Sequence, residues 1–132
     1  MEQRHPLSGL RVLEMGSRTT APYIGKLLTD AGADVLKLES PVGDPFRTWS
    51  ASGASIPDGE DAAWWRFLNA GKKSTTIDLE TDEGKDQFHN LVEETDLILD
   101  DHIPQDAQRL GITYEDIHII SPSTVLASLT HF

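Results

Sequence analysis

The chain has 132 residues, no cysteine and a formal net charge of −11, and 38% of its residues are hydrophobic. This length predicts one domain over residues 1–132, and the lack of cysteine excludes a disulfide framework, a thiolate nucleophile and a cysteine-based zinc site. The acidic balance disfavours nucleic acid and anionic membranes as partners, and the most apolar window, "AAWWRFL", is too short to cross a bilayer, so we expect a cytoplasmic protein.

The first forty residues predict a strand, a helix and a second strand. An apolar run at residues 10–15 leads into a polar loop over residues 16–20. The next apolar residues follow the i, i+3, i+4, i+7 spacing of one helix face, which predicts an amphipathic helix: Ile24, Leu27, Leu28 and Ala31. Residues 35–38 form the next apolar run, and a helix between two such strands is typical of a βαβ unit with parallel strands.

Residues 41–70 are expected to be irregular, because prolines and glycines are scattered among polar residues. Trp49, Trp64 and Trp65 flank or lie in this segment, where we expect them to pack it against the domain.

The second half predicts a further alternation of strands and helices. Residues 73–79 read as a strand, and Thr81 then caps a helix whose buried stripe is Phe88, Leu91 and Val92. Strands are predicted at residues 96–100 and 124–132. Between them lie a short helix at 105–110, stopped by Gly111, and a capping box formed by Thr113 and Asp116.

This order predicts an α/β fold: a Rossmann-like, open, mostly parallel sheet of about five strands with flanking helices. Such sheets bind ligands beyond the carboxyl ends of their strands. Here those ends are the loops that start at Gly16, Ser40, Glu80 and Asp101.

Two polar segments are candidates for anion binding. The loop Ser17-Arg18-Thr19-Thr20 precedes a helix, but it matches neither the dinucleotide fingerprint nor the P-loop, and the residues alone favour a threonine that merely caps the helix. Lys72 and Lys73 form a local positive spot, for which a solvated face is the favoured interpretation.

A second group of titratable residues ends the predicted strand 96–100. Asp100, Asp101 and His102 could hold a cation or act in acid–base chemistry, but alternation sends neighbouring side chains to opposite faces of a strand. We therefore expect no shared metal site. His131 in the last strand is expected to be structural.

Four blocks of sequence occur in one order: "PLSGLRVLEMGSRTTAPYIGKLLTDAGADVLKLESPVGDPFRTW", "FLNAGKKSTTIDLETDEG", "TDLILDDHIPQDAQRLGITYEDI" and "SPSTVLASLTHF". Together they resemble the N-terminal part of the class III coenzyme A transferases. This is the CaiB/BaiF family, which includes formyl-CoA transferase, carnitine CoA-transferase and α-methylacyl-CoA racemase. The resemblance runs from Pro6 to Phe132.

The resemblance implies a Rossmann-like domain whose strand-end loops bind coenzyme A (CoA), in a parent enzyme that acts on acyl-CoA and a carboxylic acid as an interlocked homodimer. No metal cofactor is implied. The Ser40–Asp44 turn would then face the adenosine end of CoA. The implied contacts are Thr19, Thr20, Ser40, Ile77, Asp78, Leu79, Glu80, Asp101, His102, Ile103 and Arg109.

Several of these positions depart from the family's pattern. The family often has Gln-Ala at Thr19-Thr20, a basic residue at or near Ser40 and Glu80, and Asn-Phe at Asp101-His102. Arg109 keeps the family's residue and is the expected phosphate contact, whereas Glu80 and Asp101 would repel phosphate.

The resemblance also implies that the family's aspartate nucleophile, and the racemase branch's His and Asp, lie beyond this chain. We therefore expect the N-terminal, truncated portion of a CoA-transferase or of a racemase-type relative, inactive by itself. A non-catalytic module that binds CoA or a protein within a longer polypeptide is the alternative. A receiver-like signalling domain ranks last, because residues 16–20 contain no carboxylate.

Overall fold

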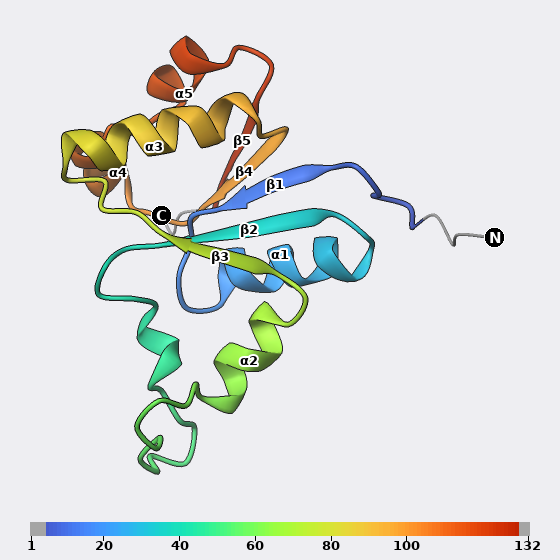
Figure 1. Cartoon of the computed structure of the whole chain (residues 1–132), viewed down its shortest axis with the longest axis vertical. Coiled ribbons are helices and arrows are strands. Elements are labelled where there is room, and N and C mark those ends of the chain that lie inside the picture. The colour runs from blue at the N-terminus through green and yellow to red at the C-terminus, as the bar shows by residue number, and fades with distance from the viewer. Residues whose placement is uncertain (1–4, 130–132) are drawn as a thin grey trace.

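A computed structural model describes residues 5–129, which form one five-stranded sheet flanked by helices (Figure 1). The strands lie in the order β3-β2-β1-β4-β5 and every neighbouring pair is parallel, so the predicted fold class is confirmed. Their bounds are β1 Arg11–Glu14, β2 Asp34–Glu39, β3 Lys73–Thr76, β4 Leu97–Asp100 and β5 Val125–Ser128. The predicted end of the last strand, with His131, lies outside the described residues.

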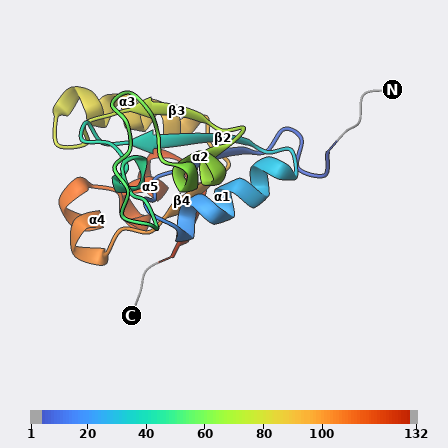
Figure 2. The same cartoon turned by 90° about the horizontal axis from the view of Figure 1, so that it is seen from below.

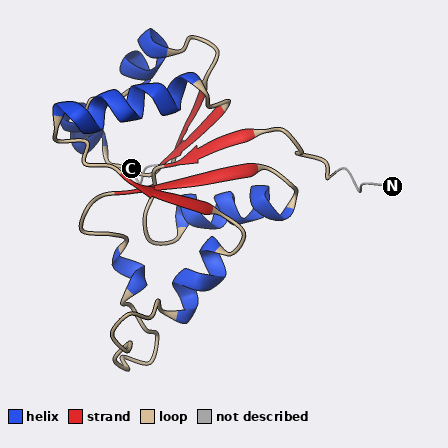
Figure 3. Ribbon diagram, in the orientation of Figure 1, coloured by secondary structure: helices blue, strands red, loops and turns tan. Residues whose placement is uncertain are grey.

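Helices cover both faces of the sheet (Figures 2 and 3). On one face lie α1 (Thr20–Asp30) and α2 (Ala63–Asn69), and on the other lie α3 (Asp82–Glu93), α4 (Pro104–Leu110) and α5 (Tyr114–Ile120). The order in which strands are added to the sheet reverses between β1 and β4. The chain adds β2 and β3 on one side of β1, and then returns to add β4 and β5 on the other side. Open α/β sheets bind ligands beside this reversal.

Alternation along the strands divides the apolar residues between two cores. Leu13 and Ile98 point toward Phe88 of α3 and Ile117 of α5. Val12 and Val35 point toward Ala21 of α1, which is fully buried. Central strands buried on both faces explain the short continuous apolar runs of the sequence.

The predicted helix signals on the second half of the chain are confirmed. The Thr81 hydroxyl accepts a hydrogen bond from the Gly84 amide at 3.0 Å and begins α3. Thr113 and Asp116 form the capping box of α5. Gly111 ends α4 with a positive φ of 71°, which costs glycine little.

The first helix differs in detail from its prediction. Ala21, Pro22 and Gly25 form its buried side, whereas Leu27 is 50% exposed. The predicted threonine cap is wrong for Thr19, which precedes α1 but makes no capping hydrogen bond through its side chain. Thr20 is already the first helical residue.

The segment 41–70 is more ordered than predicted. It contains the short 3₁₀ helix η1 (Pro45–Arg47) as well as α2. α2 begins after Ala62, which has no capping side chain, so its start carried no sequence signal. Trp65 packs against Arg47 as expected of this segment, with the guanidinium carbon 3.8 Å from the ring centroid.

Candidate ligand-binding cleft

A cleft of about 570 Å³ lies at the carboxyl ends of β1, β2, β3 and β4 and is closed on one side by α4. Its position is the one that the reversal of strand order predicts. The turn between β2 and η1 supplies one wall, and the loop between β3 and α3 supplies another.

Seven of the predicted site residues line this cleft: Ser40, Ile77, Asp78, Leu79, Glu80, His102 and Arg109. They come from three loops and one helix, and are brought together because parallel strands end at the same edge of the sheet. Thr19, Thr20, Asp101 and Ile103 lie outside the lining, so their contact with a ligand stays a prediction.

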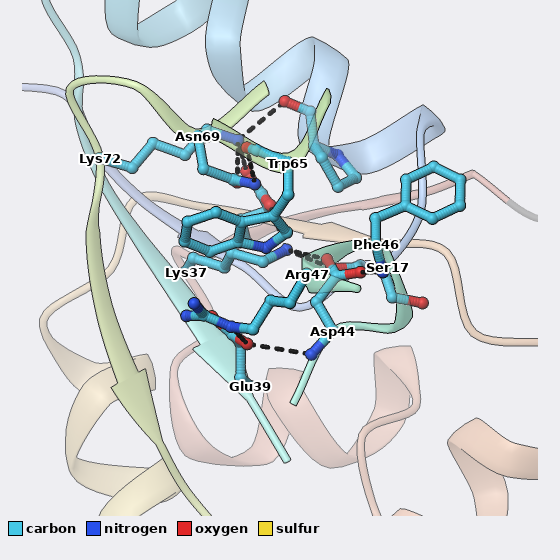
Figure 4. A network of polar contacts seen from close by, with 12 residues as sticks. Ser17, Lys37, Glu39, Asp44, Phe46, Arg47, Trp65, Asn69 and Lys72 are labelled. Carbon is cyan, nitrogen blue, oxygen red and sulfur yellow. Dashed lines mark hydrogen bonds and ion pairs between the residues drawn. The ribbon is translucent and has the colours of Figure 1, made fainter. Parts of the chain in front are cut away.

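A buried chain of charged side chains underlies the cleft (Figure 4). The Lys37 ammonium lies 3.1 Å from Glu14 Oε1 and 3.0 Å from Asp44 Oδ2, and donates to the carbonyl of Gly16 at 3.0 Å. The side chains of Lys37, Glu14 and Asp44 are at most 1% exposed. Asp44 Oδ2 makes no hydrogen bond within the described residues, so the ion pair with Lys37 is what offsets its burial.

Lys72 extends this buried chain. Its Nζ lies 2.6 Å from Glu14 Oε2 and donates to the carbonyl of Pro22 at 2.8 Å, with a side chain that is 1% exposed. The predicted solvated face is therefore wrong for Lys72, whereas Lys73 is 71% exposed as expected. Burial lowers the pKa of Lys72, and the contact with Glu14 opposes that shift.

A second ion pair fixes the turn over residues 40–44. Glu39 accepts two hydrogen bonds from Arg47, both at 2.8 Å, and a third from the Asp44 amide at 3.0 Å. Burial raises the pKa of Glu39, but the bonds from Arg47 and the Asp44 amide outweigh it and hold that pKa below its usual value. Asp44 Oδ1 then accepts from the Phe46 amide at 2.8 Å, so both ends of the turn are held.

Sequence reasoning missed this network. Glu14 and Lys37 lie within the predicted strands 10–15 and 35–38 and Asp44 lies in a predicted turn, but none of the three was a candidate site residue. A weak signal existed for Lys37, because a charged residue in a strand that is buried on both faces requires partners.

The candidate anion site at the start of α1 already holds a carboxylate of this chain. Asp101 Oδ1 accepts a hydrogen bond from the Ser17 amide at 3.1 Å. Burial raises the pKa of Asp101, and hydrogen bonds from the amides of Ser17 and Ala21 oppose that shift. Ser17 still lines the cleft, but this amide is not available to a phosphate.

Asp100 and His102 form a pair at the end of β4. His102 Nδ1 lies 2.5 Å from Asp100 Oδ1, and the two side chains are 29% and 4% exposed. The hydrogen bond to Asp100 raises the pKa of His102, although burial opposes the shift. Asp101 points elsewhere, as alternation predicted, and residues 5–129 contain no group of three His, Asp or Glu side chains suited to a metal ion.

Arg109 lines the cleft from α4 and forms an ion pair with Glu80, which lines it from the loop between β3 and α3. Both side chains are more than half exposed. The hydrogen bond with Glu80 raises the pKa of Arg109 above its already high value.

Among the described helices, none is long and apolar enough to span a membrane.

Comparison with known proteins relates the whole described fold to one family. CoA-transferase family III matches residues 7–132. The succinate–glutarate CoA-transferase of Agrobacterium fabrum is 35% identical over 98% of this chain and 33% of its own length. The succinyl-CoA–D-citramalate CoA-transferase of Chloroflexus aurantiacus is 38% identical over 96% of this chain and 31% of its own length.

A solved structure agrees with these sequence matches. The crystal structure of a CAIB/BAIF family protein from Brucella suis superposes with a TM-score of 0.89 at 36% identity, and covers 98% of this chain and 34% of that one. The chain thus spans about a third of the length of the curated relatives it matches.

Proposed function

Because the chain belongs to CoA-transferase family III, we propose that it is the CoA-binding N-terminal portion of an acyl-CoA:carboxylate CoA-transferase. The observation that carries this proposal is the cleft, in which seven residues expected to contact CoA line one hollow at the carboxyl edge of the sheet. Its volume of about 570 Å³ is in the usual range of roughly 300–1,000 Å³ for cofactor sites.

The chemistry of the lining suits the parts of CoA. Arg109 would bind a phosphate through its guanidinium, which matches phosphate oxygens in pairs. The Ser40–Asp44 turn would face the adenosine end. Ile77 and Leu79 would contact the uncharged parts of the ligand, with Asp78, Glu80 and His102 as polar neighbours.

The catalytic step belongs to another part of the parent enzyme in this proposal. An aspartate outside residues 1–132 would attack the acyl-CoA thioester, releasing CoA and forming an acyl-enzyme anhydride. The acyl-CoA and the acceptor acid would be the substrates, and an interlocked homodimer would bring the two sites together. This chain would bind and orient CoA without carrying out the transfer.

A non-catalytic module is the second candidate, and the charge of the cleft favours it. Besides His102, the lining contains two basic residues, Lys37 and Arg109, against five carboxylates: Glu39, Asp44, Asp78, Glu80 and Asp106. Such a balance weakens the binding of a polyanion.

Isothermal titration of the chain with CoA, dephospho-CoA and NAD separates the CoA-binding proposal from a module that binds only a protein partner. The CoA-binding proposal expects saturable binding of CoA, weaker binding of dephospho-CoA and none of NAD. No heat at millimolar CoA would contradict it and favour the module.

Arg109→Ala tests the expected phosphate contact. Loss of a charge-assisted bond predicts roughly ten- to hundredfold weaker CoA binding. Arg11→Ala is the matched control, since Arg11 also forms an exposed ion pair, with Asp96, but lies outside the cleft lining. An unchanged CoA affinity in Arg109→Ala would remove Arg109 from the site.

A further inference from the structure

Glu80 and Arg109 bridge two walls of the cleft that are far apart in sequence. Glu80 lies in the loop between β3 and α3, and Arg109 lies in the last turn of α4. Their ion pair therefore joins two different elements of the cleft, which both residues line.

The structure assigns to Glu80 the role of a specificity-determining residue, which holds the guanidinium of Arg109 and must be displaced before that guanidinium can bind a phosphate. This inference rests on the proposed function and adds a competing group within the site. It predicts that Glu80 lowers the affinity of the cleft for phosphate-bearing ligands and leaves uncharged ligands unaffected.

The position of Glu80 is fixed by its own loop. Its amide donates to Asp78 Oδ1 at 3.0 Å, and the Thr81 hydroxyl donates to the Asp78 carbonyl at 2.9 Å. Gly84 packs against that same carbonyl so closely that an added Cβ would lie 1.8 Å from it. These contacts hold the backbone of Glu80 in place, although the Glu80 side chain is 65% exposed.

Lys37 and His102 in the lining are already paired with buried carboxylates, which leaves Arg109 as the exposed basic side chain that a phosphate could reach. Lys37 is already paired with Glu14 and Asp44 and is 1% exposed. Arg109 is 55% exposed, and its second neighbour, Asp106, is more distant at 3.6 Å. Glu80 is therefore its nearest competitor among the described residues, and it is also a charge that repels an incoming phosphate.

Glu80→Gln keeps the length of the side chain and removes its charge. Because exposed ion pairs are weak, we expect CoA to bind roughly two- to fivefold more tightly, and inorganic pyrophosphate to gain by a similar factor. Pantetheine, which has no phosphate, should gain nothing. Glu83→Gln is the matched control, because Glu83 is an exposed carboxylate three residues away that does not line the cleft.

The double variant Glu80→Gln/Arg109→Ala tests the coupling between the two residues. If Glu80 acts by holding Arg109, its substitution should improve affinity less when Arg109 is absent. Equal gains in both backgrounds would overturn the proposed displacement, because Glu80 would then act only as a remote negative charge.

Titration of all variants with CoA and with pyrophosphate separates this inference from the proposed function. Tighter pyrophosphate binding by Glu80→Gln without measurable CoA binding would support the role of Glu80 and contradict the CoA site. CoA bound equally by Glu80→Gln and the unaltered chain would overturn the role of Glu80 alone. No binding of either ligand to any variant would overturn both.

Discussion

Lys37 connects three segments that surround the cleft. Its ammonium contacts the end of β1, the loop after β1 and the turn after β2, through Glu14, Gly16 and Asp44. Removing one member of a buried ion pair leaves its partners without a counter-charge, and this costs more than the pair contributes.

Lys37→Met should therefore lower the free energy of unfolding by about 3–5 kcal/mol, measured by urea denaturation. Lys73→Met is the control, because Lys73 is 71% exposed and pairs only with exposed Asp34, so we expect a change below about 0.5 kcal/mol. Equal effects of the two substitutions would show that the buried network does not stabilise the fold.

His102 should make stability depend on pH in a defined direction. Its pKa is raised above 6.5, chiefly by the hydrogen bond to Asp100, with further contributions from the charges of Asp101 and Asp106. A raised pKa means that the folded chain holds the proton more tightly than the unfolded chain. The resulting stabilisation is fully present below pH 6.5 and is lost as the pH rises through the folded-state pKa.

We expect His102→Asn to lose more stability relative to the unaltered chain at about pH 5.5 than at about pH 8.5, in urea denaturation at both values. Asp100→Asn should return the pKa of His102 toward its usual value in an NMR titration. A loss in His102→Asn that is the same at both pH values would contradict the charged pair.

At the scale of elements, α1 approaches the end of β1 because Gly25 has no side chain. A Cβ at this position would lie 2.1 Å from Glu14 Oε2 and 3.1 Å from Lys72 Nζ. An alanine favours a helix by about 1 kcal/mol over glycine, but here it would collide with the buried ion pair.

Gly25→Ala should therefore destabilise the chain by about 1–3 kcal/mol in thermal or urea denaturation, despite the gain in helix propensity. Gly53→Ala separates this collision from backbone strain, because Gly53 has a φ of 74° and no atom within 4 Å of an added Cβ. Its expected cost is smaller, about 1 kcal/mol. Stabilisation by Gly25→Ala would mean that α1 can move away from β1.

The elements that sequence predicted well are those with local signals. β1, β2 and β4 are apolar runs, and α3 and α5 begin at Thr81 and Thr113, whose hydroxyls accept from amides three residues later. α2 was missed because it follows a segment rich in proline and glycine and begins at an alanine, without a capping side chain. Its helix is held by packing against α1 and η1, which no local pattern reveals.

The same distinction applies to the site. Periodicity placed the ends of most strands, so Ser40, Glu80 and His102 were expected at one edge, although β3 ends at Thr76 and not at the predicted Leu79. Ion pairs between residues far apart in sequence could not be predicted in this way. Lys72 pairs with Glu14, 58 residues away, and Arg109 pairs with Glu80, 29 residues away. These contacts depend on the assembled sheet and not on spacing along the chain.

At the scale of the whole molecule, net charge should govern how fast CoA arrives. The chain carries a formal charge of −11, and CoA is itself a polyanion, so the long-range interaction is repulsive. Salt screens this repulsion, and the Debye length falls to about 10 Å at 0.1 M.

We expect the association rate of CoA in stopped-flow experiments to rise roughly two- to fivefold between about 20 and 200 mM salt. Pantetheine is the uncharged control and should show no such change. A rate for CoA that falls with salt would indicate attraction at the cleft that outweighs the charge of the molecule.

The most direct test of the CoA site is to locate CoA on the chain by NMR, following backbone amide shifts of residues 1–132 during titration with CoA. A CoA site in this cleft predicts saturable shifts at Ser40–Gly43, Ile77–Glu80, His102 and Arg109, with little change on α2 or at the amino ends of the strands. Shifts concentrated away from the carboxyl edge of the sheet, or no shifts at millimolar CoA, would contradict the assignment of this cleft as the CoA site.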